Sequence, residues 1–156
     1  MEELEIERVE RACTRLIHEY AAKLDGGRAD TLWELFTDDG VWEMPGRHTF
    51  RGRPELRQLA PDLLGDDARI TMHLCTNVVV DVVAANTARG HCYFVNHRAD
   101  FATVEAVQRP SWNTVPRYVG EYSDTFARMN GRWLISRRVI RVNFAVPISH
   151  RPAAGQ

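Results

Sequence analysis

The chain has 156 residues, the length of one domain, and its 20 basic and 21 acidic side chains leave a net charge of −1. This balance offers no basic surface that would favour nucleic acid or an anionic membrane as a partner. No apolar run reaches the ~20 residues that a membrane helix needs, and the acidic first residues lack the apolar core of a signal peptide. Three cysteines without C-x-x-C spacing indicate reduced thiols, so we expect a cytoplasmic protein.

Hydrophobic periodicity predicts three helices in the first part of the chain. Between Cys13 and Leu24, apolar residues recur every three or four positions, which is typical of a helix with one buried face, and Gly26-Gly27 end it. Pro54 is suited to the first position of another helix. The predicted order is a helix up to Leu24, a short helix over 29–36, a turn over 38–40, a strand over 41–44 and a helix over 53–64.

The second part of the chain is rich in β-branched residues and predicts four long strands, over 70–83, 87–101, 117–129 and 132–144. Asn130-Gly131 favours a tight hairpin between the last two. We expect an irregular loop over 103–115 and a loose or partner-dependent tail over 147–156. The order predicts a single α+β domain over 1–146, in which a curved antiparallel sheet wraps around the N-terminal helices as a cone with a blind pocket.

Polar side chains occupy strand positions where a buried face is usually apolar. Because side chains alternate along a strand, residues two apart share a face. The sets expected to share a face are His73, Cys75 and Asn77; His91, Tyr93, Val95 and His97; Tyr118, Gly120, Tyr122 and Asp124; and Arg137, Val139 and Arg141. Tyr20 and Asp25, five residues apart at the end of the first helix, are expected near one end of the same pocket.

These residue types favour acid–base chemistry without a cofactor. A carboxylate such as Asp25, hydrogen-bonded to His73, would fix the tautomer of the imidazole and raise its basicity. The histidine could then abstract a proton beside a carbonyl, while a second histidine or a tyrosine protonates the departing oxygen. Three alternatives stay open: Asp25 and His73 are structural, Cys75 or Cys92 is a nucleophile, or Asp25, His73 and His97 bind a metal. The cysteines are more typical of buried apolar positions, and compact metal-ligand spacing is missing.

Five fragments follow one another in a specific order and spacing. They are Tyr20-Ala-Ala-Lys-Leu-Asp25-Gly-Gly, Leu35-Phe36-Thr37-Asp38-Asp39-Gly40-Val41-Trp42, Arg51-Gly52-Arg53, Met72-His73-Leu74-Cys75-Thr76-Asn77, and Tyr122 to Trp133. From Glu7 to about Phe144, this pattern resembles the SnoaL-like branch of the nuclear transport factor 2-like (NTF2-like) superfamily. The resemblance implies the cone-shaped α+β fold and a homodimer or homotrimer, whose interface the apolar residues Val142, Phe144, Val146 and Ile148 could join.

Within the superfamily the chain is most similar to scytalone dehydratase, bile-acid 7α-dehydratase and hexachlorocyclohexane dehydrochlorinase, which are lyases. The catalytic residues expected from this resemblance are Asp25, His73, His97 and Tyr20. The side chains expected to contact the substrate are Asn77, Trp42, Tyr122, Arg128 and Arg141. Trp42 stands near a position where scytalone dehydratase has a tyrosine that binds the substrate carbonyl, so Tyr20 or Tyr122 would take that role here.

The leading hypothesis is a cofactor-independent lyase, a dehydratase acting on a small cyclic or polycyclic substrate of polyketide, steroid or aromatic type. A polyketide cyclase or a double-bond isomerase would use the same pocket, because both need an acid and a base near a carbonyl. A non-catalytic ligand-binding or assembly module is a third hypothesis. Asp25 and His73 about 3 Å apart on a cavity would favour an enzyme, whereas a solid apolar core would favour the module.

Overall fold

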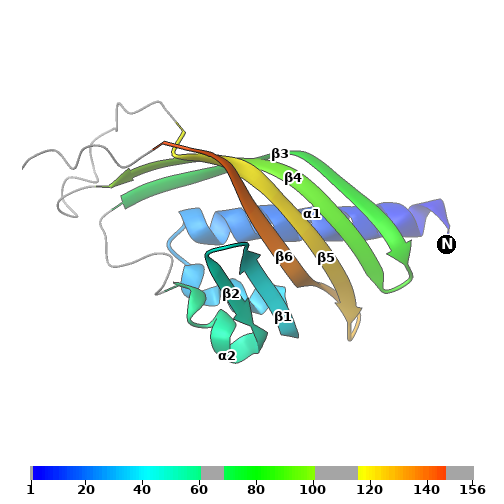
Figure 1. The fold of residues 1–156 in the computed structure, drawn as a ribbon. Helices are drawn as coiled ribbons and strands as arrows, with labels where there is room; N and C mark the ends of the chain where they lie inside the picture. The colour runs from blue at the N-terminus through cyan, green and yellow to red at the C-terminus, as the bar shows by residue number, and fades with distance from the viewer. Residues whose placement is uncertain (1, 61–68, 101–115, 147–156) are drawn as a thin grey trace, which may run out of the picture.

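Six strands of the described chain form one curved sheet that folds over a long helix (Figure 1). The structure is a computed structural model that describes residues 2–60, 69–100 and 116–146. Its helices are α1 (Glu3–Asp25), the 3₁₀ helix η1 (Ala29–Leu35) and α2 (Gly52–Leu56). Its strands are β1 (Phe36–Met44), β2 (His48–Arg51), β3 (Arg69–Ala84), β4 (Thr87–Asp100), β5 (Tyr118–Met129) and β6 (Arg132–Ala145).

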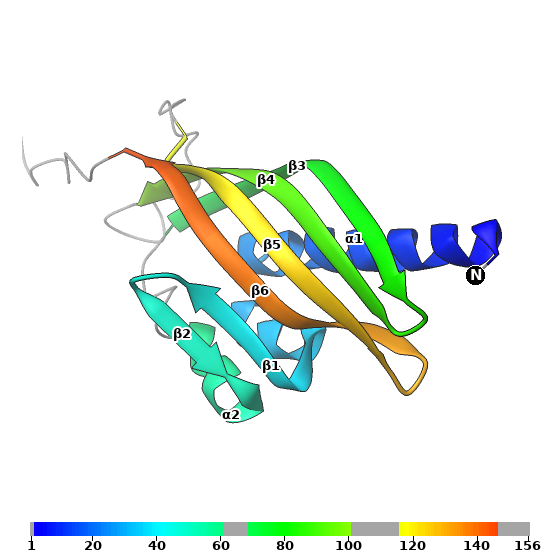
Figure 2. The ribbon, with the colours of Figure 1, turned by 45° about the vertical axis from the view of Figure 1, so that its right-hand side comes forward.

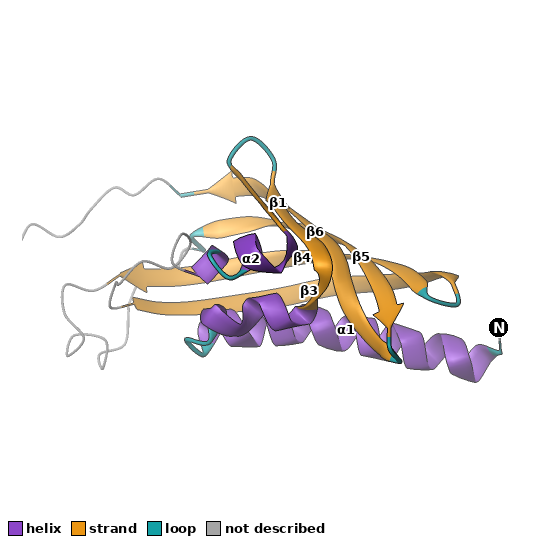
Figure 3. Cartoon of the chain, turned by 90° about the horizontal axis from the view of Figure 1, so that it is seen from below, coloured by secondary structure: helices purple, strands orange, loops and turns teal. Residues whose placement is uncertain are grey.

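The sheet has the strand order β2-β1-β6-β5-β4-β3 and an open edge on each side, as Figure 2 shows. All neighbouring strands are antiparallel except β1 and β6, which run parallel. Seen from below in Figure 3, α1 lies alongside β3, and α2 lies by β1. The α+β fold with a curved sheet around the N-terminal helices is therefore confirmed, but the sheet is mixed rather than wholly antiparallel.

Helix α1 forms where the periodicity predicts it and buries the predicted face. Cys13, Ile17 and Tyr20 are at most 1% exposed and pack in the same core as the apolar side chains of the sheet. The helix ends at Asp25, and Gly27 then adopts a φ of 67°, a left-handed conformation that glycine adopts without strain. This ending places the Asp25 side chain beside the sheet.

The segment between α1 and β3 differs from the prediction in three places. Residues 38–40 do not form a turn, because they lie within β1, where a register shift between Phe36 and Val41 accommodates them. The strand β2 was not predicted; it pairs with β1 through the turn after Met44. The predicted helix over 53–64 is interrupted: α2 ends at Leu56, a turn covers 57 and 58, and 59 and 60 are helical again, while positions 61–64 lie outside the described residues.

The four long strands lie where they were predicted, within a few residues at each end. In the β5–β6 hairpin, Asn130 and Gly131 have φ values of 52° and 79°, the conformation that the Asn-Gly dipeptide predicts. The predicted loop over 103–115 and the tail over 147–156 lie outside the described residues. None of the helices in the described part of the chain combines the length and the apolarity that crossing a membrane requires.

The outer face of the sheet exposes large apolar side chains, among them Met72, Leu74, Tyr93 and Phe144. Exposed apolar patches of this kind often mark contact surfaces. They are compatible with the expected dimer or trimer, which stays a prediction.

Candidate active site

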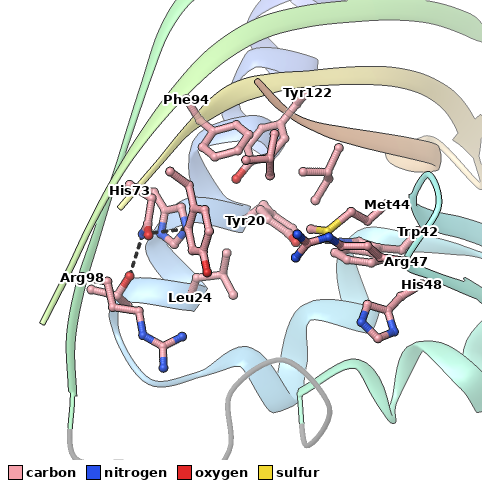
Figure 4. Close-up of a pocket in the computed structure, with 15 residues that line it drawn as sticks. Tyr20, Leu24, Trp42, Met44, Arg47, His48, His73, Phe94, Arg98 and Tyr122 are labelled. Carbon is pink, nitrogen blue, oxygen red and sulfur yellow. Dashed lines mark hydrogen bonds between the residues drawn. The ribbon is translucent and has the colours of Figure 1, made fainter. Parts of the chain in front are cut away.

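A cavity of about 210 Å³ lies between the concave face of the sheet and the C-terminal end of α1 (Figure 4). Its inner wall is aromatic and buried: Tyr20, Trp42, Phe94 and Tyr122 are at most 4% exposed. Arg47, from the turn between β1 and β2, and His48, the first residue of β2, are exposed and lie at its mouth. The cone is therefore hollow at this end rather than filled by an apolar core.

His73 lines this cavity, and Asp25 holds it from behind. The Nδ1 atom of His73 lies 2.6 Å from Oδ1 of Asp25, and the backbone N–H of His73 donates to Oδ2 of the same carboxylate at 2.7 Å. Their side chains are 14% and 24% exposed. Because both carboxylate oxygens accept from His73, the ring carries its proton on Nδ1, and the lone pair of Nε2 is left to act as a base. The prediction that Asp25 and His73 lie within hydrogen-bonding distance is confirmed.

Asn96, which the sequence analysis did not single out, completes the surroundings of the imidazole. Its Nδ2 atom lies 3.1 Å from Nε2 of His73 and donates to Oγ1 of Thr71 at 2.8 Å. With one amide hydrogen on each acceptor, Asn96 favours the tautomer in which Nε2 is unprotonated. The amide is 3% exposed, so solvent does not compete strongly for these bonds.

His97, expected to be a catalytic residue, lies on the opposite face of β4 and does not line the cavity. It pairs in register with Met72, whose side chain is exposed, whereas Asn96 pairs with His73. Alternation along β4 explains this outcome: Asn96 shares the buried face of Cys92 and Phe94, so His97 shares the other face with Tyr93, which is 46% exposed. The arrangement also separates the two histidines of the metal-site alternative.

Tyr20 brings a phenol hydroxyl to the inner end of the cavity. The indole N–H of Trp42 donates to its oxygen at 2.8 Å, so the hydroxyl hydrogen of Tyr20 remains available to a ligand. Tyr122 packs edge-on against Tyr20, with ring centroids 5.8 Å apart, and stacks on Phe94. Burial raises the pKa of Tyr20 more than Arg138 and the Trp42 hydrogen bond lower it. Tyr20 is therefore protonated at neutral pH and able to donate a proton.

Behind these two tyrosines lies a buried ion pair that the sequence analysis missed. Arg138 donates from Nε and Nη2 to the two carboxylate oxygens of Asp124 at 2.8 and 2.6 Å, and both side chains are 0% exposed. The guanidinium lies 4.1 Å from the ring centre of Tyr20 and 4.5 Å from that of Tyr122. Burial alone would lower the pKa of Arg138, but the neighbouring charge of Asp124 and its hydrogen bonds raise that pKa by a larger amount. The arginine therefore stays charged.

Asn77, Arg128 and Arg141, three of the side chains expected to contact the substrate, do not line the cavity. Asn77 is exposed at the bulge and accepts a hydrogen bond from Thr76. Arg141 lies on the outer face of β6, 3.4 Å from Glu121. Arg128 lines a separate groove by the N-terminal end of α1, whose nearest helix residue, Val9, is about 16 Å along the helix from Tyr20 of the cavity by the rise per residue.

The thiols of Cys75 and Cys92, on the inner face of the sheet, have pKa values shifted in opposite directions. A hydrogen bond with the Cys92 thiol lowers the pKa of Cys75, whereas the same bond and burial raise the pKa of Cys92. Neither lines the cavity. Reactivity in a thiol needs both a lowered pKa and access, so the structure gives no support to a cysteine nucleophile here.

Comparisons with known proteins agree with this fold. A model of the SnoaL-like domain family matches residues 7–139. The solved hexachlorocyclohexane dehydrochlorinase LinA-type3 from Novosphingobium barchaimii is 20% identical, with a TM-score of 0.76 over 95% of each chain. A candidate scytalone dehydratase from Novosphingobium aromaticivorans is 22% identical, with a TM-score of 0.73 over 90% of this chain and 88% of that one. No curated protein sequence matches the chain. At these identities the solved structures show a shared fold.

Proposed function

The chain belongs to the SnoaL-like domain family, and from that premise we propose that it is a cofactor-independent lyase, a dehydratase acting on a small cyclic or polycyclic substrate. The observation that supports this most is the Asp25–His73 pair, joined at 2.6 Å, of which His73 lines a mainly apolar cavity. Two of the structural neighbours are, by name, a dehydrochlorinase and a candidate dehydratase. Both names describe eliminations, which need an acid and a base and no redox group.

In the proposed reaction, His73 is the general base. Its Nε2 atom accepts a proton from the carbon beside a carbonyl of the substrate, displacing the hydrogen bond from Asn96. The Asp25 carboxylate stabilises the imidazolium that forms, since it already holds the opposite nitrogen at 2.6 Å. A positioned general base of this kind contributes about 10²–10⁴-fold in rate.

Tyr20 is the proposed general acid, in place of His97. The electron pair of the broken C–H bond forms the new double bond through the enolate, and the C–O bond breaks. The departing hydroxide takes the phenol proton of Tyr20 and leaves as water. The Trp42 indole N–H, 2.8 Å from the phenol oxygen, and the Arg138 guanidinium stabilise the tyrosinate until it is reprotonated.

The test is turnover of cyclic β-hydroxy ketones, followed by the ultraviolet absorbance of the conjugated enone and by loss of water in the mass spectrum. We expect His73→Gln to lower kcat at least about 100-fold on any ketone that the wild-type protein dehydrates. His97→Gln is the matched control, because this histidine lies on the outer face of the neighbouring strand β4 and does not line the cavity, so the kcat of this variant is expected to stay unchanged. Wild-type turnover by the His73→Gln variant would contradict the proposal.

A further inference from the structure

The hydroxyl of Thr71 lies beside the proposed base, and the elimination described above does not use it. Thr71 precedes His73 by two residues on β3, and both side chains line the cavity. Its Oγ1 atom accepts a hydrogen bond from Nδ2 of Asn96 at 2.8 Å, and the same Nδ2 atom lies 3.1 Å from Nε2 of His73 (Figure 4). One buried amide therefore fixes the position of the hydroxyl relative to the base.

The hydroxyl hydrogen of Thr71 is available to a ligand. A threonine hydroxyl has one hydrogen to donate, and here its oxygen is already the acceptor of an amide hydrogen. No residue in the described part of the chain accepts a hydrogen bond from it. A hydroxyl that accepts one hydrogen bond becomes a stronger donor in another, because the two bonds polarise the O–H group in the same sense. Thr71 therefore offers the cavity a polarised donor.

The spacing between this donor and the base matches the atoms of a ketone that loses an α-proton. The two N–H bonds of the Asn96 amide diverge by about 120°, so Oγ1 of Thr71 and Nε2 of His73 stand about 5 Å apart. In a ketone, the carbonyl oxygen and the α-carbon are about 2.4 Å apart. With this carbon about 3 Å from Nε2 and the oxygen about 2.8 Å from Oγ1, the ketone spans the gap. The donor thus stands where negative charge develops as the proton leaves.

We propose that Thr71 is a further catalytic residue, whose hydroxyl donates a hydrogen bond to the substrate carbonyl and stabilises the enolate that forms when His73 removes the α-proton. The C–H electron pair forms the carbon–carbon double bond of the enolate, and the π electron pair of the carbonyl moves onto oxygen. The proton goes to Nε2 of His73, and Thr71 keeps its own. This inference rests on the proposed function, and it assigns carbonyl binding to Thr71 in place of Tyr20 or Tyr122.

The test uses 1-tetralone, a cyclic ketone with α-hydrogens and no leaving group, so that proton removal is measured without an elimination. We expect wild-type protein in D₂O to exchange these hydrogens for deuterium, as followed by proton NMR. Thr71→Val removes the hydroxyl and is expected to lower the exchange rate at saturating ketone at least about tenfold. Thr71→Ser keeps the hydroxyl and is expected to retain most of the rate. Thr76→Val, on the outward face of β3, is the matched control and is expected to exchange as the wild type does.

Two further readouts separate contact with the carbonyl from a structural role of Thr71. Infrared spectroscopy is expected to show the C=O stretch of bound 1-tetralone at lower wavenumber in the wild type than in Thr71→Val. Nitrogen-15 NMR is expected to show the Nδ1–H tautomer of His73 in both proteins. An identical stretch in the two proteins, a change of tautomer in Thr71→Val, wild-type exchange by Thr71→Val, or no binding of 1-tetralone at millimolar concentration would each overturn the inference.

One more variant distinguishes this inference from the proposed function. His73→Leu can neither take a proton nor donate a hydrogen bond, and it is expected to abolish the exchange while keeping the lowered C=O stretch, because Thr71 still contacts the carbonyl. A stretch that rises to the Thr71→Val value in His73→Leu would place the carbonyl on the imidazole and overturn the inference. A wild-type protein that lowers the stretch but exchanges no deuterium would instead support the Thr71 contact and contradict His73 as the base.

Discussion

Replacing Asp25 by asparagine tests the central pair with the smallest change of shape. The two oxygens of Asp25 face two donors, the Nδ1–H and the backbone N–H of His73, at 2.6 and 2.7 Å. An asparagine has one oxygen, so its NH₂ group must face one of these donors. If it faces the ring, the imidazole avoids the clash by moving its proton to Nε2, the atom that has to act as the base.

The size of the effect follows from these contacts. The wild-type bond to Oδ1 is short, charge-assisted and only partly open to solvent, and it becomes an ion pair once the ring is protonated. Losing the correct tautomer and the counter-charge in a comparable acid–base pair lowers turnover by about 10²–10⁴-fold. That range corresponds to about 3–5 kcal/mol of the activation free energy. The affinity for substrate is expected to change little, because Asp25 does not line the cavity.

Two measurements check this. Enone formation gives kcat and KM for Asp25→Asn, and nitrogen-15 NMR of the histidine ring gives the tautomer of His73 without any substrate. We expect the proton on Nδ1 in the wild type and on Nε2 in the variant. A variant that keeps the Nδ1–H tautomer and wild-type kcat would show that Asp25 has only a structural role at the helix end.

Three other changes give separate tests. Asn96→Asp sets a second carboxylate against Nε2 of His73, which favours the doubly protonated ring, so the pH–rate profile should move to higher pH. Gly120→Ala should destabilise the fold by about 3 kcal/mol in urea unfolding, because a Cβ there would overlap a backbone carbonyl oxygen of β6 and lie 2.8 Å from an aromatic ring. Burial and then Asp124 raise the pKa of the Cys13 thiol from 9.0 to about 12. The stability that this thiol contributes is present below pH 9 and is lost as the pH rises to about 12, by about 1.4 kcal/mol per pH unit. Cys13→Ala should make the measured decrease over this range less steep.

The features predicted correctly from the sequence are those set by local chemistry. The apolar spacing of α1 and the glycines after it fix both its buried face and the position of Asp25. Asn130-Gly131 fixes the β5–β6 turn, and the inward face of β5, with Tyr122 and Asp124, follows from simple alternation. Each of these depends on residues within a few positions of one another, so a single sequence contains the information.

Two features that the sequence did not predict depend on register shifts in the curved sheet. In β3, Asn77 adopts a φ of 53°, and the shift there changes the inward positions from Val78 and Val80 to Cys75 and His73. In β6, the register with β5 shifts after Phe126↔Ile135, so Asp124 pairs with Arg138 instead of Arg137. A one-residue shift exchanges the two faces of a strand from that point on. Where a bulge forms depends on how the sheet bends around α1, which no local pattern in the sequence specifies.

The register shift in β6 brings the charged pair of Asp124 and Arg138 into the core, where burying the two charges costs free energy. Removing two ions from water is expensive, and their attraction offsets the cost only if the geometry is good. Here both bonds of the Asp124–Arg138 pair are short, while the third guanidinium nitrogen, Nη1, has no partner in the described structure. The rings of Tyr20 and Tyr122 both lie against the guanidinium, so the pair holds the two tyrosines of the cavity wall in place.

A double-mutant cycle on this pair separates positioning from stability. Asp124→Leu and Arg138→Met should each destabilise the protein by about 3–5 kcal/mol, because each leaves one buried charge without its partner. Asp124→Leu combined with Arg138→Met should cost less than either single change, since no unpaired charge remains. The double variant should nevertheless show a lower kcat with little change in KM, because Tyr20 has lost the cation that stabilises its phenolate. Urea unfolding and enone formation measure the two effects. If kcat were unchanged in a double variant that folds, the guanidinium would have no part in positioning Tyr20 or in stabilising its phenolate.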